Sequence, residues 1–391
     1  MARREAYTKG GRIVSYGIGK ISAVEGMTLV AMLIVPSIYL TEPSLSIGFV
    51  GNSAWLLKIC SGLLLLGLLL AILKIYQNYI DKFCNGRMIT FFSFVQGVLG
   101  RSGGMIFFIL WAVLFHLSTV LMIREFTDHT LMTTLKTGNL KLVLLIFAVA
   151  IFFMMRYGLE VILRCAYLLL VVRAITLIIL LFLLFSSYDV TQLLPWQGYG
   201  MGSLAKYSFL DIGTGATSMA IFFIIPHLQN IATMKKSILY GMAYVTFFKM
   251  ILILMMIMTF GIIVSPERVL LFYELVRCVN LSQYVQRVDS IFILMWLTAG
   301  LMSIVVTQYL SVMIYCEAFK LTDSKALMAI AMLLTTSIAM LPDSTITALT
   351  MSGFFIYQWS TAFMVFSFII LGIGYYVKCR RNSSCVGQGL R

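Results

Sequence analysis

Ten apolar windows of about 20 residues follow one another along this chain and leave little sequence between them. Windows of this length are typical of helices that cross a bilayer. Hydrophobic residues make up 61% of the 391 residues and charged residues only 11%, which excludes a water-soluble globule. We therefore predict an all-α polytopic membrane protein with one transmembrane domain over 23–377. Its ten predicted transmembrane helices are 24–41, 54–75, 104–123, 140–155, 161–186, 214–230, 238–264, 291–313, 325–341 and 355–377.

Lysine and arginine indicate on which side of the membrane the two ends lie, because cytoplasmic connections hold an excess of these residues. With the N-terminus inside, nineteen of the 29 fall on the inner side, eight on the outer side and two within spans. The pattern predicts that the tails 1–22 and 378–391 both lie in the cytoplasm. The net charge of +14 follows from this bias, with some attraction to anionic membrane lipid, and gives no reason to expect a nucleic-acid partner.

Residues with catalytic or metal-binding chemistry are sparse. The seven cysteines are scattered without a CxxC pair, and the three histidines do not accompany them at ligand spacing. The sequence also has no phosphate-binding glycine-rich loop followed by lysine. We therefore expect no metal, no cofactor and no enzymatic activity, with an intramembrane enzyme or scaffold as the least supported alternative.

The first predicted span is interrupted by the stretch "MLIVPSIYLTEPS", residues 32–44. Pro36 removes one helical hydrogen bond and clashes with the preceding turn, which frees backbone carbonyls near Met32 and Leu33. An unwound stretch survives in a membrane only where it is buried in protein or lines a polar cavity. Two interpretations follow: a simple proline kink, or part of a binding site.

The sixth predicted span carries a second interruption, because Gly213, Thr214 and Gly215 precede its apolar run and Pro226 closes it. Spans one and six correspond if the ten spans form two sets of five. An odd number of spans per set places the second set upside down, and paired broken helices then indicate a substrate site. The repeats would cover about 24–186 and 214–377. The alternative is that the glycines serve only close helix packing.

Five stretches between about Lys20 and Lys325 also stand in a characteristic order and spacing: "GKISAVEGMTLVAML", "AWLLKICSGLLLLGLLLAIL", "VLGRSGGMIFFILWAVLFHLSTVLMIREFTD", "RYGLEVILRCAYLLL" and "QRVDSIFILMWL". Together they resemble the endospore germination permease family. Its members are the B subunits of nutrient germinant receptors, within the amino acid-polyamine-organocation transporter superfamily. The resemblance implies a LeuT-like fold of five plus five helices in the inner membrane of a spore.

The same resemblance implies that the chain binds a small nutrient, usually an amino acid, and triggers spore germination. It also implies assembly with an A subunit and a lipoprotein C subunit. The alternative is an amino acid uptake permease of the same fold, which differs in that the ligand crosses the membrane.

Residue by residue, the resemblance places a ligand pocket at the two interruptions. Where the family often has a carboxylate just after the glycine-containing break, this chain has Ala216, Thr217 and Ser218 instead, and Asp211 lies only upstream. The N-terminal end of a half-helix suits a ligand carboxylate, and the freed carbonyls suit its ammonium group, so we expect no buried acid to be required. The predicted ligand-binding residues are Val35, Pro36, Ser37, Gly213, Thr214, Gly215, Ala216 and Thr217.

Charged residues within or beside the spans are the last candidate functional residues, because placing each charge in a membrane costs free energy. Arg173 on the fifth span is predicted to take the place of the coupling cation of sodium-dependent relatives, or else to pair with a structural acid or reach an interface. The role of Lys249, on the seventh span, stays open. Arg287 and Asp289 are predicted to contact the outer loop or another subunit, or merely to mark the membrane boundary. The inner segment 74–104 is predicted to be a membrane-surface helix, or a contact for a partner.

Overall fold

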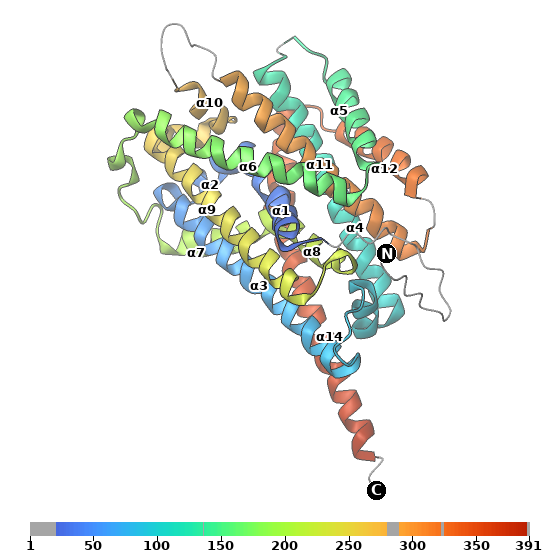
Figure 1. The fold of residues 1–391 in the computed structure, drawn as a ribbon. Coiled ribbons are helices and arrows are strands. Elements are labelled where there is room, and N and C mark those ends of the chain that lie inside the picture. The colour runs from blue at the N-terminus through green and yellow to red at the C-terminus, as the bar shows by residue number, and fades with distance from the viewer. Residues whose placement is uncertain (1–20, 136, 280–288, 322–323, 389–391) are drawn as a thin grey trace.

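The computed structural model describes residues 21–135, 137–279, 289–321 and 324–388, and within these ranges the chain is helical with no β-strand. Figure 1 shows the helices gathered into one bundle. The α-helices are α1 Ala23–Ile34, α2 Glu42–Val50, α3 Ala54–Phe83, α4 Phe91–Thr133, α5 Leu140–Met155, α6 Leu159–Leu183, α7 Met201–Leu210, α8 Ala220–Phe223, α9 Ile231–Val264, α10 Leu271–Arg277, α11 Asp289–Phe319, α12 Ser324–Ala339, α13 Thr345–Phe354 and α14 Thr361–Gln388.

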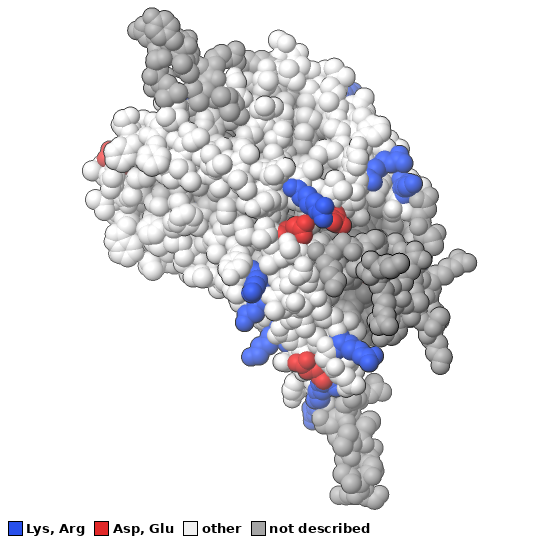
Figure 2. All heavy atoms as spheres, in the orientation of Figure 1, with Lys and Arg blue, Asp and Glu red and all other residues white. Residues whose placement is uncertain are grey.

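Six helical segments of the described residues are long and apolar enough to cross a membrane: Glu42–Phe83, Phe91–Thr133, Leu159–Leu183, Ile231–Glu267, Phe292–Phe319 and Thr345–Arg380. Three shorter apolar helices, Ala23–Tyr39, Leu140–Met155 and Ser324–Ala339, accompany them. Most of the face shown in Figure 2 carries neither acidic nor basic side chains. Large hydrophobic side chains such as Phe182 and Phe185 are exposed on the outside of the bundle, as lipid contact requires. The chain is thus an integral membrane protein, and the count of ten spans stays a prediction.

The first interruption is confirmed. Helix α1 begins with Ser22 and Glu25 in a capping box and ends at Ile34. A 3-10 segment, Val35–Tyr39, follows with Pro36 near its start, and α2 begins only at Glu42. The α-helical hydrogen-bond pattern is therefore broken in the middle of the bundle, where α1 lies among α6, α9 and α11 (Figure 1).

The second interruption is also confirmed at the predicted glycines, and an unpredicted helix precedes it. Residues 187–213 were expected to be a loop, yet Met201–Leu210 forms α7, and the 3-10 segment Asp211–Met219 separates it from α8. The predicted glycines therefore lie inside the break. Helix α7 escaped detection because its sequence "MGSLAKYSFL" mixes polar and apolar residues and buries only Leu204 and Ser208.

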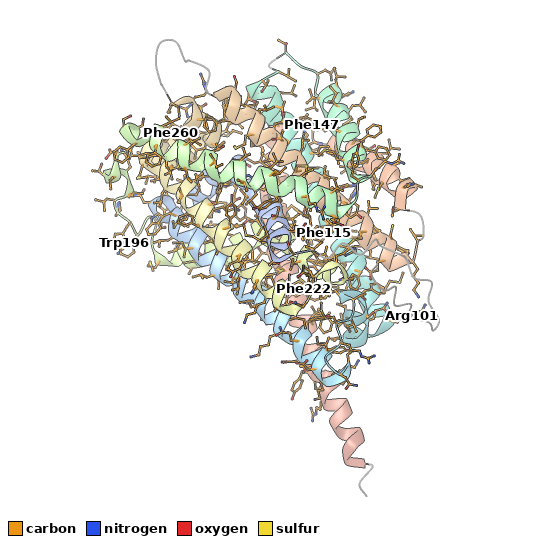
Figure 3. All side chains as sticks on the ribbon, viewed as in Figure 1. Arg101, Phe115, Phe147, Trp196, Phe222 and Phe260 are labelled. Atoms are coloured by element: carbon orange, nitrogen blue, oxygen red, sulfur yellow. The ribbon has the colours of Figure 1, made fainter. Side chains whose placement is uncertain are left out.

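The four-residue helix α8 is held by aromatic packing. The ring of Phe222 lies 5.4 Å from that of Phe91, and the ring of Phe223 lies 5.9 Å from that of Phe115. Figure 3 shows Phe115 and Phe222 within the bundle and Trp196 at its edge. Burying such rings contributes much of the packing energy of a helix bundle. The second half of the broken helix is thereby anchored against α4.

Small residues let α1 and α9 approach closely. A Cβ atom at Gly26 would lie 2.2 Å from the Oγ atom of Ser237, and one at Gly241 would lie 2.8 Å from the Cβ atom of Val30. The Ser237 hydroxyl donates to the Ala23 carbonyl across this contact at 3.2 Å. Close backbone approach through small residues is the usual way in which membrane helices pack.

The inner segment 74–104 is divided between three elements. Helix α3 continues to Phe83, residues 84–90 form a connection, and α4 begins at Phe91 and is kinked at Gly100, whose φ of 79° suits glycine. The ring of Phe94 packs on those of Tyr76 and Tyr79 at 5.4 and 5.1 Å. The segment is thus not a single helix, and its predicted place on the membrane surface or in contact with a partner stays a prediction.

Candidate functional site

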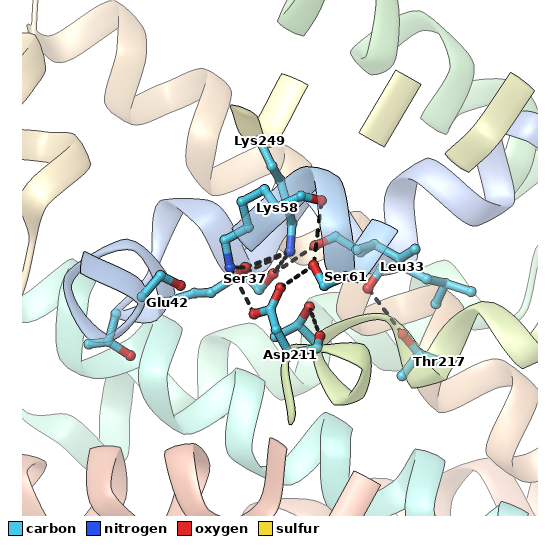
Figure 4. Close-up of polar contacts among 12 residues, drawn as sticks. Leu33, Ser37, Glu42, Lys58, Ser61, Asp211, Thr217 and Lys249 are labelled. Atoms are coloured by element: carbon cyan, nitrogen blue, oxygen red, sulfur yellow. Dashed lines mark hydrogen bonds and ion pairs between the residues drawn. The ribbon is translucent and has the colours of Figure 1, made fainter. Parts of the chain in front are cut away.

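The two broken helices meet at the centre of the bundle. The Thr217 hydroxyl, in the second break, donates to the Leu33 carbonyl at the end of α1 over 3.2 Å. In the first break, the Ser37 hydroxyl donates to the Ile34 carbonyl over 2.7 Å. The carbonyls that Pro36 was expected to free are therefore partly satisfied by hydroxyl groups, and one of these bonds joins the two breaks directly (Figure 4).

A network of buried charges lies beside the breaks (Figure 4). The Lys58 Nζ atom, on α3, lies 2.6 Å from Glu42 Oε1 and 2.8 Å from Asp211 Oδ1. The Ser61 hydroxyl donates to the other oxygen of Asp211 over 2.6 Å. Since Glu42 begins α2 and Asp211 begins the second break, Lys58 connects the two broken helices through α3.

Lys249 joins the same network from α9. Its Nζ atom donates to the Ser37 hydroxyl over 3.0 Å and to the two Glu42 carboxylate oxygens over 2.8 and 2.7 Å. The charged side chains of the network, Glu42, Lys58, Asp211 and Lys249, are each at most 4% exposed. We call these four residues the buried tetrad.

The buried tetrad contains two ammonium groups and two carboxylates, so its charges cancel when all four are ionised. Moving one isolated charge into a membrane interior is costly, and an ion pair with further hydrogen bonds reduces that cost. Removal of any one member would therefore leave a buried charge without compensation. The tetrad also connects both breaks to α3 and α9.

A cavity of about 60 Å³ lies against both breaks. Its walls come from the two breaks, from α4, and from α13 with the π-helical turn Phe355–Ser360 that follows it. The cavity is lined by Leu33, Ser37, Leu40, Thr41, Glu42, Leu45, Ser118, Leu121, Met122, Glu125, Gly213, Thr214, Thr217, Ser352, Gly353, Phe355, Ile356, Tyr357 and Ser360.

Glu125 is a buried carboxylate in this cavity wall and is 4% exposed. It accepts hydrogen bonds from the Thr41 backbone N–H at 3.2 Å, the Thr41 hydroxyl at 2.6 Å and the Ser352 hydroxyl at 3.2 Å. These three donors are neutral. Among the residues that the structure describes, no lysine or arginine forms an ion pair with Glu125.

Four of the eight predicted ligand-binding residues line the cavity: Ser37, Gly213, Thr214 and Thr217. The others, Val35, Pro36, Gly215 and Ala216, belong to the breaks but are not part of the cavity wall. A Cβ atom at Gly215 would lie 2.2 Å from Leu65 Cδ2, so this glycine permits contact with α3. One at Gly213 would lie 1.9 Å from the Ile356 carbonyl oxygen, so that glycine permits close approach to the π-helical turn.

Arg173 lies fully buried on α6, away from the cavity wall. Its Nη2 atom lies 3.5 Å from the Met32 sulfur, and its guanidinium carbon lies 5.5 Å from the centre of the Tyr39 ring. Within the described part of the chain, Nε and Nη1 have no hydrogen-bond partner. In the same described residues Arg173 forms no ion pair, so the alternative that it pairs with a structural acid has no support there. The predicted role of Arg173 as a fixed cation beside the first break is untested.

The pair expected to contact the outer loop or a subunit is only partly placed. Arg287 lies outside the described residues, and Asp289 is the first residue of α11. Their role stays a prediction.

Three charged residues of the site are not among the residues predicted from the sequence: Glu42, Lys58 and Glu125. The windows near them ended at residue 41, began at residue 54 and ended at residue 123, so each charge was assigned to a span end. In the structure, α4 continues to Thr133 and carries Glu125 inside the bundle. A usable signal was the absence of proline and glycine in "VLMIREFTDHT", which lets the helix continue past the charge; in the structure every residue from Ile123 to Thr130 is buried.

Among the described residues, no group of three or more histidine, cysteine, aspartate or glutamate side chains is arranged to hold a metal ion. The polar groups of the site suit reversible binding of a small charged or zwitterionic molecule, because hydroxyl groups, the carboxylates of Glu42 and Glu125 and apolar walls converge on one cavity.

Comparison with known proteins gives a family and a fold. The model of a family described as spore germination protein matches residues 20–348. No curated protein matches the chain. Two solved transporter structures are similar to it at 13% identity, which shows the fold alone.

The first is Mhp1, a nucleobase-cation-symport-1 family transporter, in a closed conformation with bromovinylhydantoin bound. The match has a TM-score of 0.54 and covers 86% of this chain and 77% of that one. The second is the manganese transporter of Eremococcus coleocola in complex with an aromatic bis-isothiourea substituted compound. That match has a TM-score of 0.53 and covers 90% of this chain and 76% of the other.

Proposed function

Because the chain belongs to the spore germination protein family, we propose that it is the B subunit of a germinant receptor and binds a small nutrient, an amino acid, to trigger germination. The observation that carries this proposal is the cavity between the two broken helices, whose polar groups come from both breaks and from α4. The proposal includes a place in the spore inner membrane with both termini in the cytoplasm. It also includes assembly with A and C subunits, and no enzymatic step.

The buried tetrad gives the proposed receptor a way to respond to its ligand. Glu42 belongs both to the tetrad and to the cavity wall, and Ser37 lines the cavity while accepting from Lys249. A ligand that favours one arrangement of the breaks shifts the population of the whole bundle by its difference in affinity between the two states. The proposed signal is that shift, which partner subunits detect.

A fixed cation supports a sensor that needs no ion gradient. Arg173 contacts Met32 in α1 and Tyr39 at the end of the first break, where it stabilises the broken helix permanently. We include in the proposal that Arg173 replaces a coupling cation, so ligand binding is independent of sodium.

An amino acid uptake permease is the second candidate, because both structural neighbours are transporters. The two functions differ in one measurable respect. A permease accumulates its ligand in the cell, whereas a sensor changes the germination response without accumulation.

The test compares spores with and without this gene across a panel of single amino acids and sugars, and follows uptake of each active, labelled compound. Loss of a germination response on deletion, without gene-dependent accumulation of label, supports the receptor. Gene-dependent accumulation with unchanged germination refutes it in favour of the permease. Complementation with the intact gene is the control for polar effects of the deletion.

A further inference from the structure

Glu125 is the cavity group whose charge is least compensated. Its carboxylate has about four acceptor positions, and three of them are used by Thr41 and Ser352. All three donors are neutral, so they stabilise the carboxylate by hydrogen bonding but leave its charge in place. A carboxylate buried in a membrane bundle without a cation favours any ligand that supplies one.

The nearby cations are already paired. Arg124, the preceding residue, donates to Asp128 over 3.0 Å and to the Ala339 carbonyl over 2.9 Å. Lys58 and Lys249 contact the two carboxylates of the tetrad. Arg173, which forms no ion pair within the described ranges, contacts Met32 and Tyr39 instead, and none of the printed ion pairs there reaches Glu125.

The remaining walls of the cavity indicate the rest of the ligand that would carry the cationic group. Leu33, Leu40, Leu121, Met122 and Ile356 present apolar side chains to the cavity. An apolar wall of this kind binds a compact hydrocarbon group. The chemistry that fits is a molecule with a protonated primary amine and a small apolar side chain.

We propose that Glu125 binds the protonated amine of the ligand, so that the cavity selects small amines over 2-hydroxy acids with the same carbon skeleton. This inference rests on the proposed function, because it assigns a group to the same site. It also differs from the expectation that backbone carbonyls receive the ammonium group without a buried acid: the Leu33 carbonyl accepts from Thr217 instead.

The test uses the purified full-length chain in detergent micelles and measures the melting temperature against ligand concentration. The probes are the α-amino acids from glycine to leucine, each paired with its 2-hydroxy acid. The variants are Glu125→Gln, which keeps the shape and removes the charge, and Ser118→Phe, which fills the cavity from α4. Glu267→Gln, an exposed carboxylate in the segment Ser265–Glu267, is the matched control.

The expected result is that at least one amino acid stabilises the wild-type chain and the Glu267→Gln variant, while its 2-hydroxy acid does not. Glu125→Gln should weaken binding of that amino acid by about 30-fold or more, because an ion pair in a buried site is lost. Its melting temperature without ligand should stay within a few degrees of the wild-type value. If Glu125→Gln does not fold, Glu125→Asp should bind the same amine more weakly and keep its preference for the amine.

Three results overturn the inference. The first is equal stabilisation by an amino acid and its 2-hydroxy acid, and the second is no response of the wild-type chain to any amine. The third is an unchanged amine affinity in Glu125→Gln, or a loss of the amine preference in Glu125→Asp. If Ser118→Phe abolishes binding while Glu125→Gln does not, the cavity stands and only the role of Glu125 fails. If Ser118→Phe also leaves binding unchanged, the proposed site itself fails.

Discussion

Removing the Lys58 ammonium group should destabilise the protein more than any surface substitution. In Lys58→Met, Asp211 keeps only the Ser61 hydroxyl as a side-chain donor, while Glu42 still contacts Lys249. One negative charge is then left without compensation in a site that is at most 4% exposed. Both broken helices also lose their joint attachment to α3.

The size of the effect follows from the distances. Two unit charges 2.8 Å apart, as in Lys58 and Asp211, attract by about 6 kcal/mol at an effective dielectric constant of about 20. Part of this is offset because the lysine no longer has to be desolvated. Breaking one side of a buried pair costs about 3–5 kcal/mol overall, and we expect a loss of that order.

The assay is thermal unfolding of the purified chain, followed by the fraction that remains monodisperse after heating. A double variant, Lys58→Met with Asp211→Asn, leaves the neutral pair Glu42–Lys249 and should recover about half or more of the loss. Lys74→Met is the matched control, because Lys74 is an exposed lysine on the same helix, and it should change stability by no more than about 0.5 kcal/mol. The reasoning is refuted if Lys58→Met is as stable as Lys74→Met, or if the double variant is no more stable than Lys58→Met alone.

Three further predictions concern the breaks. Gly215→Ala should lower the melting temperature, because its Cβ atom would lie 2.2 Å from Leu65, and adding Leu65→Ala should restore part of the loss; an unchanged melting temperature in Gly215→Ala contradicts this packing role. Thr217→Val should destabilise the chain by about 1–3 kcal/mol, because the Leu33 carbonyl loses its hydroxyl donor, whereas wild-type stability in this variant would show that the bond is dispensable. Ligand binding should have the same affinity in sodium and choline chloride if Arg173 is a fixed cation, and a strong sodium dependence measured by equilibrium binding would refute that role.

The interruptions could be predicted because they depend on local backbone chemistry. Pro36 cannot donate to the preceding turn, and the glycines of "GTG" weaken a helix wherever they occur. Helix α7, which precedes the second break, was not predicted, since its mixed sequence is one that a hydropathy window scores as a loop. Only half of the predicted ligand-binding residues line the cavity, because a break turns successive residues in different directions. The sequence alone does not say on which face of the break the cavity lies.

By itself, the sequence determined that the chain is an α-helical membrane protein with helices broken near Pro36 and the Gly213–Gly215 stretch, because hydrophobic length and backbone constraints are local properties. Only the tertiary structure decided that Lys58, 153 residues from Asp211 in the chain, becomes its partner. It likewise brought Glu125 to the first break, where it accepts from Thr41. The hydropathy of a charged residue gives its cost in a membrane, but the partner that offsets this cost comes from another helix, and helix packing alone decides which one.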